Sequence, residues 1–216
     1  MKKMALALAL ISVGMFVYAQ ANLPEYYPVS GKWASSGGRL YQNDESARLA
    51  KANIPALQDS EVMIYEFDAR YEGGAEDGHG GFGLHIFVDT AHNSASWGAG
   101  KSYLIWLNYD ETPQNKNIQP GLSAQLYRSL SNSQMELVES FDMNDYADLL
   151  TDENLAEPVF FKIIADASTG EIHVYDPTTE EEVYYVLNMD ENNLPITGKW
   201  VVLRTNGMKM SFAPAQ

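Results

Sequence analysis

Cysteine is absent from the 216-residue chain. The protein therefore has no disulfide, no thiolate nucleophile, no iron–sulfur cluster and no cysteine-ligated zinc. Basic residues are scarce, since 14 Lys and Arg stand against 29 Asp and Glu, for a formal net charge of −15. Because nucleic acid and anionic lipid surfaces both require a basic face, the sequence excludes them as partners.

Several catalytic motifs are missing as well. The sequence has no GxxxxGK[ST] phosphate loop, no HExxH metal pair and no GxSxG nucleophile elbow. What is abundant is apolar and aromatic: 45% of residues are hydrophobic and 12% aromatic, with 13 tyrosines. This composition is typical of a folded globular protein, and tyrosine favours strands and wet binding surfaces.

The first 19 residues have the pattern of a signal peptide. Lys2 and Lys3 form a basic start, residues 4–17 are an apolar run, and small residues follow at positions 19 and 21. We expect cleavage before Gln20, with a cut before Asn22 as the alternative. An uncleaved anchor is the competing interpretation, but the run is shorter than the ~20 residues that a bilayer span needs.

This leader predicts a single mature domain over residues 20–216 that is exported to the periplasm or the cell exterior, with no membrane span after cleavage. Without cysteine, an exported domain must be held together by its core rather than by disulfides.

The mature chain consists of short alternating segments separated by turn residues, which is typical of an all-β protein. We predict strands over Glu61–Tyr71, Phe82–Asp89, Tyr103–Tyr109, Ser123–Ser129, Val159–Asp166, Glu171–Tyr175, Val183–Leu187, Trp200–Arg204 and Met208–Phe212. Residues 73–81 are expected to form a glycine-rich loop. Hairpin turns are expected at residues 167–170 and at Asn206-Gly207.

Helix is scarce in this pattern. Residues 142–150 are compatible with one short helix, and residues 46–52 are ambiguous between helix and strand. The sequence therefore predicts an all-β fold with two antiparallel sheets, a sandwich or jelly roll, and one or two short helices.

An ordered series of motifs extends over nearly the whole mature chain. It comprises Gly31-x-Trp33, Gly38-x-Leu40-x-Gln42, residues 66–70, Gly81-x-Gly83-Leu84, Ser102-Tyr103-Leu104, Leu126-Tyr127-Arg128, Phe161-Lys162-Ile163, residues 170–175 and residues 198–212. This series resembles the concanavalin A-like lectin/glucanase superfamily, which includes laminin G-like modules. The resemblance implies two curved sheets of about six strands each and a concave face that often binds saccharide.

The resemblance also bears on metal binding. Such domains often end in Phe-Asp and use this end to help hold a structural calcium ion, whereas here the end is Ser211-Phe212-Ala213. Acidic pairs such as Glu76-Asp77 offer oxygen ligands, but no motif supports a calcium site. We therefore expect no cofactor and leave the metal undecided.

One face of the predicted strands carries the candidate binding residues. Alternation places Glu66, Asp68 and Arg70 on one side of their strand. We predict that this side shares a surface with further polar and aromatic groups, so that a sugar ring stacks on tryptophan while its hydroxyls bond to planar polar groups. The candidate ligand-binding residues are Glu66, Asp68, Arg70, His85, Trp106, Asn108 and Arg128. An ion-pair ladder on a solvated sheet face is an equally good interpretation of Glu66, Asp68 and Arg70.

The motif Glu66-Phe67-Asp68 also resembles the Glu-x-Asp strand motif of retaining glucanases of this fold. The next residue on the same face is Arg70, where such enzymes carry a second glutamate, so the acid/base is missing. We therefore predict no catalytic residues. Trp97, on a glycine-rich loop, is either an exposed binding anchor or a cover folded over the core.

Taken together, these patterns predict an exported, acidic, non-catalytic protein that binds carbohydrate or another extracytoplasmic ligand on one sheet face. A structural or assembly component of a periplasmic or cell-surface structure, with protein partners, is the alternative. A glycoside hydrolase is the third interpretation.

Overall fold

The computed structural model describes residues 23–145, 157–175, 185–189 and 196–215. These residues form two seven-stranded sheets in which every pairing is antiparallel. The predicted signal peptide and most of the predicted helix at 142–150 lie outside the described residues. Within the described ranges, no helix reaches the length and hydrophobicity needed to cross a membrane.

Sheet A has the strand order β1-β4-β13-β6-β7-β8-β9. Its strands are β1 (Tyr27–Ser30), β4 (Ala50–Gln58), β13 (Gly198–Asn206), β6 (His79–Val88), β7 (Ser102–Asp110), β8 (Gly121–Ser129) and β9 (Met135–Asp142).

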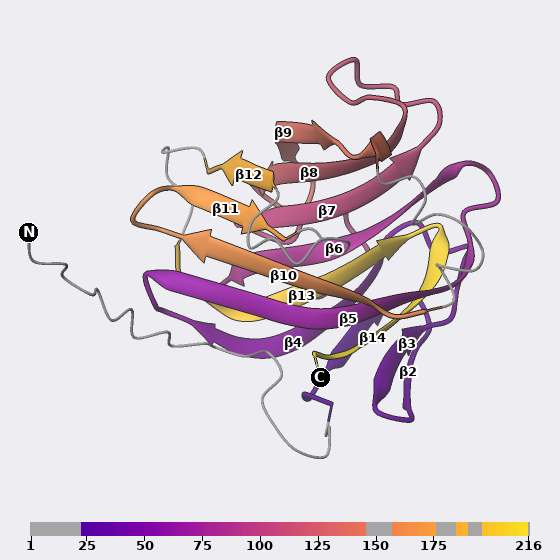
Figure 1. Ribbon diagram of the computed structural model, residues 1–216. Helices are drawn as coiled ribbons and strands as arrows, with labels where there is room; N and C mark the ends of the chain where they lie inside the picture. The colour runs from indigo at the N-terminus through magenta and orange to yellow at the C-terminus, as the bar shows by residue number, and fades with distance from the viewer. Residues whose placement is uncertain (1–22, 146–156, 176–184, 190–195, 216) are drawn as a thin grey trace, which may run out of the picture.

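Sheet B has the order β12-β11-β10-β5-β14-β3-β2. Its strands are β12 (Tyr185–Asn188), β11 (Glu171–Val174), β10 (Val159–Asp166), β5 (Val62–Gly74), β14 (Met208–Pro214), β3 (Arg39–Gln42) and β2 (Trp33–Ser36). Figure 1 shows the two sheets stacked as layers, with β5 and β10 in one and β4, β6 and β13 in the other.

The core lies between the layers and follows the predicted alternation. On β5, Met63, Tyr65 and Phe67 are buried against the opposite sheet, while the residues between them face outward. The rings of Phe67, Phe161 and Phe212 are in contact with one another or with Phe82. Aromatic contacts of this kind join β5, β10 and β14 of sheet B to β6 of sheet A. The prediction of an all-β, two-layer sandwich is confirmed.

Most of the predicted strands are present with small shifts at their ends. The hairpin at residues 167–170 joins β10 and β11 as predicted. The predicted loop at 73–81 is shorter, because β5 extends to Gly74 and β6 begins at His79. Strands β1, β2, β3, β4 and β9 were not predicted, and the ambiguous segment 46–52 enters β4 at Ala50.

The hairpin predicted at Asn206-Gly207 is wrong. Strand β13 belongs to sheet A and β14 to sheet B, so this turn carries the chain from one layer to the other. Gly207 has φ +66 and is held by hydrogen bonds from its N–H to the Ala47 carbonyl and from the Ala75 N–H to its own carbonyl. The Asn-Gly pair predicts a turn residue with positive φ, which Gly207 has. Such a residue can stand either in a hairpin or where the chain crosses between layers, so the pair alone did not distinguish the two.

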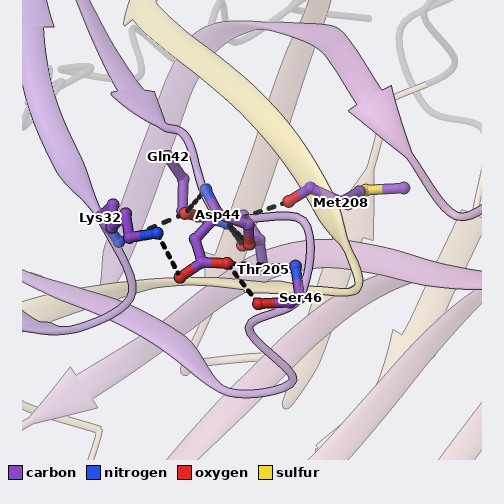
Figure 2. Close-up of polar contacts among 6 residues, drawn as sticks. All are labelled: Lys32, Gln42, Asp44, Ser46, Thr205 and Met208. Carbon is purple, nitrogen blue, oxygen red and sulfur yellow. Dashed lines mark hydrogen bonds and ion pairs between the residues drawn. The ribbon is translucent and has the colours of Figure 1, made fainter.

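A buried glutamine lies at this crossing. The side-chain nitrogen of Gln42, on β3, donates to the Thr205 hydroxyl at 3.2 Å and to the Met208 carbonyl at 3.0 Å. Its Oε1 accepts the Asp44 N–H at 2.6 Å. Figure 2 shows this amide among Asp44, Thr205 and Met208. Thr205 lies one residue before the end of β13 in sheet A, and Met208 begins β14 in sheet B. The side chain of Gln42 is therefore hydrogen-bonded to both layers.

Candidate functional site

The predicted β5 residues lie on the outer face of sheet B. Lys162 Nζ is 3.3 Å from Glu66 Oε1 across the β10–β5 pairing, and Arg70 Nη2 is 2.7 Å from Glu72 Oε1. Burial raises the pKa of Asp68, and the positive charge of Arg39 acts against this shift. These contacts resemble the ion-pair ladder that the sequence allowed as an alternative interpretation.

The other predicted residues belong to sheet A, so the predicted common surface is wrong. His85 is on β6, Trp106 and Asn108 are on β7, and all three face away from the core. Alternation told which side of its own strand each residue occupies but not which sheet the strand joins. Glu66, Asp68 and Arg70 are therefore on the opposite outer face of the sandwich.

Arg128 is also separated from Trp106. It is aligned with the core residue Tyr103, whereas its neighbour Tyr127 is aligned with Leu104, on the side of Trp106. Arg128 forms an ion pair with Glu136 of β9. The residues of β8 that share the outer face with Trp106 thus include Gln125 and Tyr127, but not Arg128.

The segment Asp89–Lys101 lies across the outer face of sheet A and is fixed there by buried polar side chains. The ammonium of Lys51 donates to the Ser96 carbonyl at 2.6 Å and to the Gly98 carbonyl at 2.7 Å. Asn53 exchanges two hydrogen bonds with the backbone of His92, at 2.7 and 2.9 Å. Because these donors and acceptors are buried, the loop has a defined position on the sheet.

Further hydrogen bonds hold the end of this loop. The Ser129 hydroxyl donates to the Gly100 carbonyl at 2.7 Å and accepts the Ala99 N–H at 3.1 Å. Ser102 donates to the Ala99 carbonyl at 3.0 Å, and His85 Nδ1 lies 3.1 Å from the Ser102 hydroxyl. His85 is completely buried beneath the loop and has no exposed surface to offer a ligand.

The loop presents Trp97 above the guanidinium of Arg204. The guanidinium carbon lies 4.9 Å from the centroid of Trp97 and 5.0 Å from that of Trp106, so Arg204 contacts both indoles. Its Nη1 also donates to the Trp97 carbonyl at 2.9 Å. Trp106 is only 5% exposed, whereas Trp97 is 51% exposed. Trp97 is therefore half exposed and stacks on Arg204 at the outer face of sheet A instead of covering the core between the sheets.

Planar polar groups lie beside this stack on β7 and β8. Asn108 Oδ1 accepts the indole N–H of Trp106 at 2.9 Å, which fixes the orientation of both side chains. The Tyr127 hydroxyl donates to Gln125 Oε1 at 2.8 Å. The phenol of Tyr127 acts against the effect of burial on Arg204 by raising the pKa of the guanidinium. The combination of an indole with amide and phenol groups can stack on a ring and bond to hydroxyls.

The titratable groups under the loop are unusual because no acidic partner for them occurs within the described part of the chain. Burial lowers the pKa of Arg204 to about 10. Burial first, and the charge of Arg204 second, lower the pKa of Lys51 to about 7. Burial and the charge of Lys51 lower the pKa of His92 to about 4, and burial holds the pKa of His85 well below its ordinary value. The two histidines are therefore neutral near pH 7, and no group of three or more acidic or histidine side chains suited to a metal occurs among the described residues.

Glycines of β6 make room for Trp106. A Cβ at Gly81 would lie 2.4 Å from Trp106 Cζ2 and 2.7 Å from the Leu107 carbonyl oxygen. A Cβ at Gly83 would lie 2.0 Å from the Ile105 carbonyl oxygen. Gly81 thus provides a flat floor for the indole, and it does so within strand β6 rather than in the loop predicted for residues 73–81.

Gly81→Ala is expected to lower the free energy of unfolding by about 2 kcal/mol, because the new methyl group overlaps the indole of Trp106. Denaturant titration followed by tryptophan fluorescence measures the loss. In a Trp106→Leu background, the same substitution should have a smaller effect, since the overlapping ring atoms are gone. Equal losses in the two backgrounds would contradict the role of Gly81 as a floor for Trp106.

Comparison with known proteins identifies the fold. No protein-family model matches the chain, and a search of curated protein sequences finds no match. Among solved structures, the Bacillus subtilis carbohydrate-binding module CBM66 aligns with a TM-score of 0.55 and 12% identity over 88% of this chain and 92% of that one. The metal-free exoplasmic/lumenal domain of VIP36 aligns at 0.53 and 13% identity over 89% and 84% of the two chains.

A third solved structure is a Bacillus subtilis protein of unknown function with a galectin-like fold. It aligns at 0.52 and 14% identity over 88% of this chain and 86% of that one. Sequence identities this low show only that the folds are alike. The chain has a concanavalin A-like, lectin-type β-sandwich fold.

Proposed function

We propose that the protein is an exported, non-catalytic domain that binds carbohydrate on the outer face of sheet A. The observation that carries the proposal is Trp97, a half-exposed indole on a loop fixed by Lys51, Asn53 and Arg204. A fixed aromatic surface binds a sugar ring without first losing conformational freedom. The solved structures of similar fold include a carbohydrate-binding module, which is consistent with this role.

Two further features support the proposal. The leader over residues 1–19 directs the chain to a compartment where glycans are abundant. The carboxylates that resembled a hydrolase motif, Glu66 and Asp68, belong to β5 of the other sheet, away from both tryptophans of the stack. A saccharide on Trp97 therefore lies beyond their reach, in keeping with binding without hydrolysis.

Trp97→Ala is expected to weaken glycan binding at least about tenfold, because the substitution removes the stacking surface. Binding is measured on a glycan array and then by calorimetry with the strongest glycan. Phe160→Ala is the matched control, since Phe160 is an exposed aromatic (40%) on sheet B and should leave affinity unchanged.

Three outcomes would overturn the proposal. One is glycan binding that survives Trp97→Ala in full. Another is a protein that binds no glycan and co-purifies in a large sedimenting assembly, which would favour the structural role. Release of reducing sugar by the wild type, abolished by Glu66→Gln, would instead identify a hydrolase.

A further inference from the structure

We propose that the saccharide held by Trp97 is a chain that also contacts a second aromatic surface on the same face, formed by Tyr27 of β1 and Trp200 of β13. This inference rests on the proposed function and specifies its ligand as an extended polysaccharide rather than a single sugar. The second surface is hereafter the Tyr27–Trp200 surface.

Three observations place the Tyr27–Trp200 surface on the outer face of sheet A. Tyr27 is aligned with Asn53, whose amide reaches the overlying loop. Trp200 packs against a small cluster formed by Val88, Val202 and Ala99 of that loop, separate from the core between the sheets. The two rings meet edge to face, with centroids 5.8 Å apart and planes at 75°.

The chemistry of this surface suits a sugar ring. Tyr27 is 44% exposed and is not part of the core, so core packing does not require an aromatic residue at this position. Its hydroxyl donates to a carboxylate oxygen of Glu25, so an acceptor for sugar hydroxyls lies directly beside the ring. An exposed aromatic with an adjacent carboxylate offers stacking and directed hydrogen bonds together.

The distance between the two aromatic surfaces sets the length of the ligand. Trp200 and Arg204 both face outward on β13, four residues apart, which corresponds to about 13 Å along a strand. Trp97 lies over Arg204, and the packed Ala99 and Val202 fill the space between the two surfaces. A ligand that contacts both must therefore span roughly three linked rings or more.

Because the loop is fixed, the two surfaces keep a constant separation. Once one part of a saccharide chain stacks on Trp97, its next rings are held near Tyr27 at a high effective concentration. Affinity should then rise steeply with chain length, and a short saccharide should sense only one surface.

Affinity electrophoresis tests this inference. The full-length mature protein is run in native gels that contain mannan, dextran, laminarin, xylan or pectin, and oligosaccharides of one to six units from the retarding polysaccharide are then titrated by calorimetry. We expect affinity to increase with length from two to six units. Tyr27→Ala should lower the affinity for the hexamer and the polymer about tenfold and leave the disaccharide affinity unchanged. Phe160→Ala should alter neither.

The outcomes separate this inference from the proposed function. Retardation that Trp97→Ala abolishes but Tyr27→Ala does not change would overturn the extended site and leave the proposed function standing. Equal affinity for the dimer and the hexamer would do the same. The absence of retardation in every gel, together with no glycan-array signal, would overturn the proposed function itself. Circular dichroism melts of each variant check that the exposed substitutions leave the fold intact.

Discussion

Replacing Gln42 by leucine is expected to lower the free energy of unfolding by about 3 kcal/mol. The change leaves the Thr205 hydroxyl, the Met208 carbonyl and the Asp44 N–H without their partner at a completely buried position. Each buried polar group that loses its hydrogen bond destabilises the fold by about 1–3 kcal/mol, and partial hydration near Asp44 limits the total. Guanidinium titration followed by circular dichroism measures the loss.

The matched control is Gln114→Leu, because Gln114 is exposed in the connection between β7 and β8. That substitution should change stability by less than about 0.5 kcal/mol. A loss below about 1 kcal/mol for Gln42→Leu would mean that water or neighbouring groups replace the amide readily, and that Gln42 does not hold the two layers together.

Lys51 is expected to make the stability of the protein increase with pH above neutrality. Its pKa is about 7 in the folded protein, against 10.5 for an unperturbed lysine, because it is buried beneath the loop beside Arg204. Between these two values the unfolded chain binds a proton that the folded protein has released. Stability therefore rises with pH in this window, by as much as about 1.4 kcal/mol per pH unit, and the Lys51 contribution is constant below pH 7.

The measurement is the free energy of unfolding of the wild type minus that of Lys51→Met, at pH 7, 8 and 9. We expect this difference to shift in favour of the wild type by about 2 kcal/mol from pH 7 to pH 9. Three groups face Lys51. The pKa of His92 is about 4, that of His85 is well below its ordinary value, and that of Arg204 is about 10. None of these groups has its midpoint between pH 7 and pH 9, so the shift over this range reports chiefly Lys51. Lys116→Met, at an exposed position, should give a flat difference, whereas parallel profiles for wild type and Lys51→Met would contradict the lowered pKa.

The fold was largely predictable because alternation survives wherever one side of a strand is buried and the other is solvated. Residues 61–71 and 159–166 show this pattern clearly and became β5 and β10 almost unchanged. The run Ala50-Lys51-Ala52-Asn53-Ile54 also alternates, and it could have identified β4. Strands β1, β2 and β3 have only four residues each, too few for a period of two to stand out.

The site was harder to predict because it depends on contacts distant in sequence. Trp106 and Asn108 were correctly placed on one outward face of their strand, and Trp97 was recognised as a candidate anchor. Nothing in the sequence near Arg204 indicated that it would lie between Trp97 and Trp106, more than ninety residues away. Polar residues such as Lys51 are rarely buried, so their role beneath a loop becomes visible only when the loop is in place.

The positions of β13 and β14 have a consequence for biosynthesis. These strands come late in the chain, yet each lies inside its sheet, β13 between β4 and β6 and β14 between β5 and β3. A nascent polypeptide that ends before residue 198 lacks a central strand in both layers at once and leaves the inner edges of β4, β6, β5 and β3 unpaired. Native folding of both layers must therefore wait until the ribosome has added these strands.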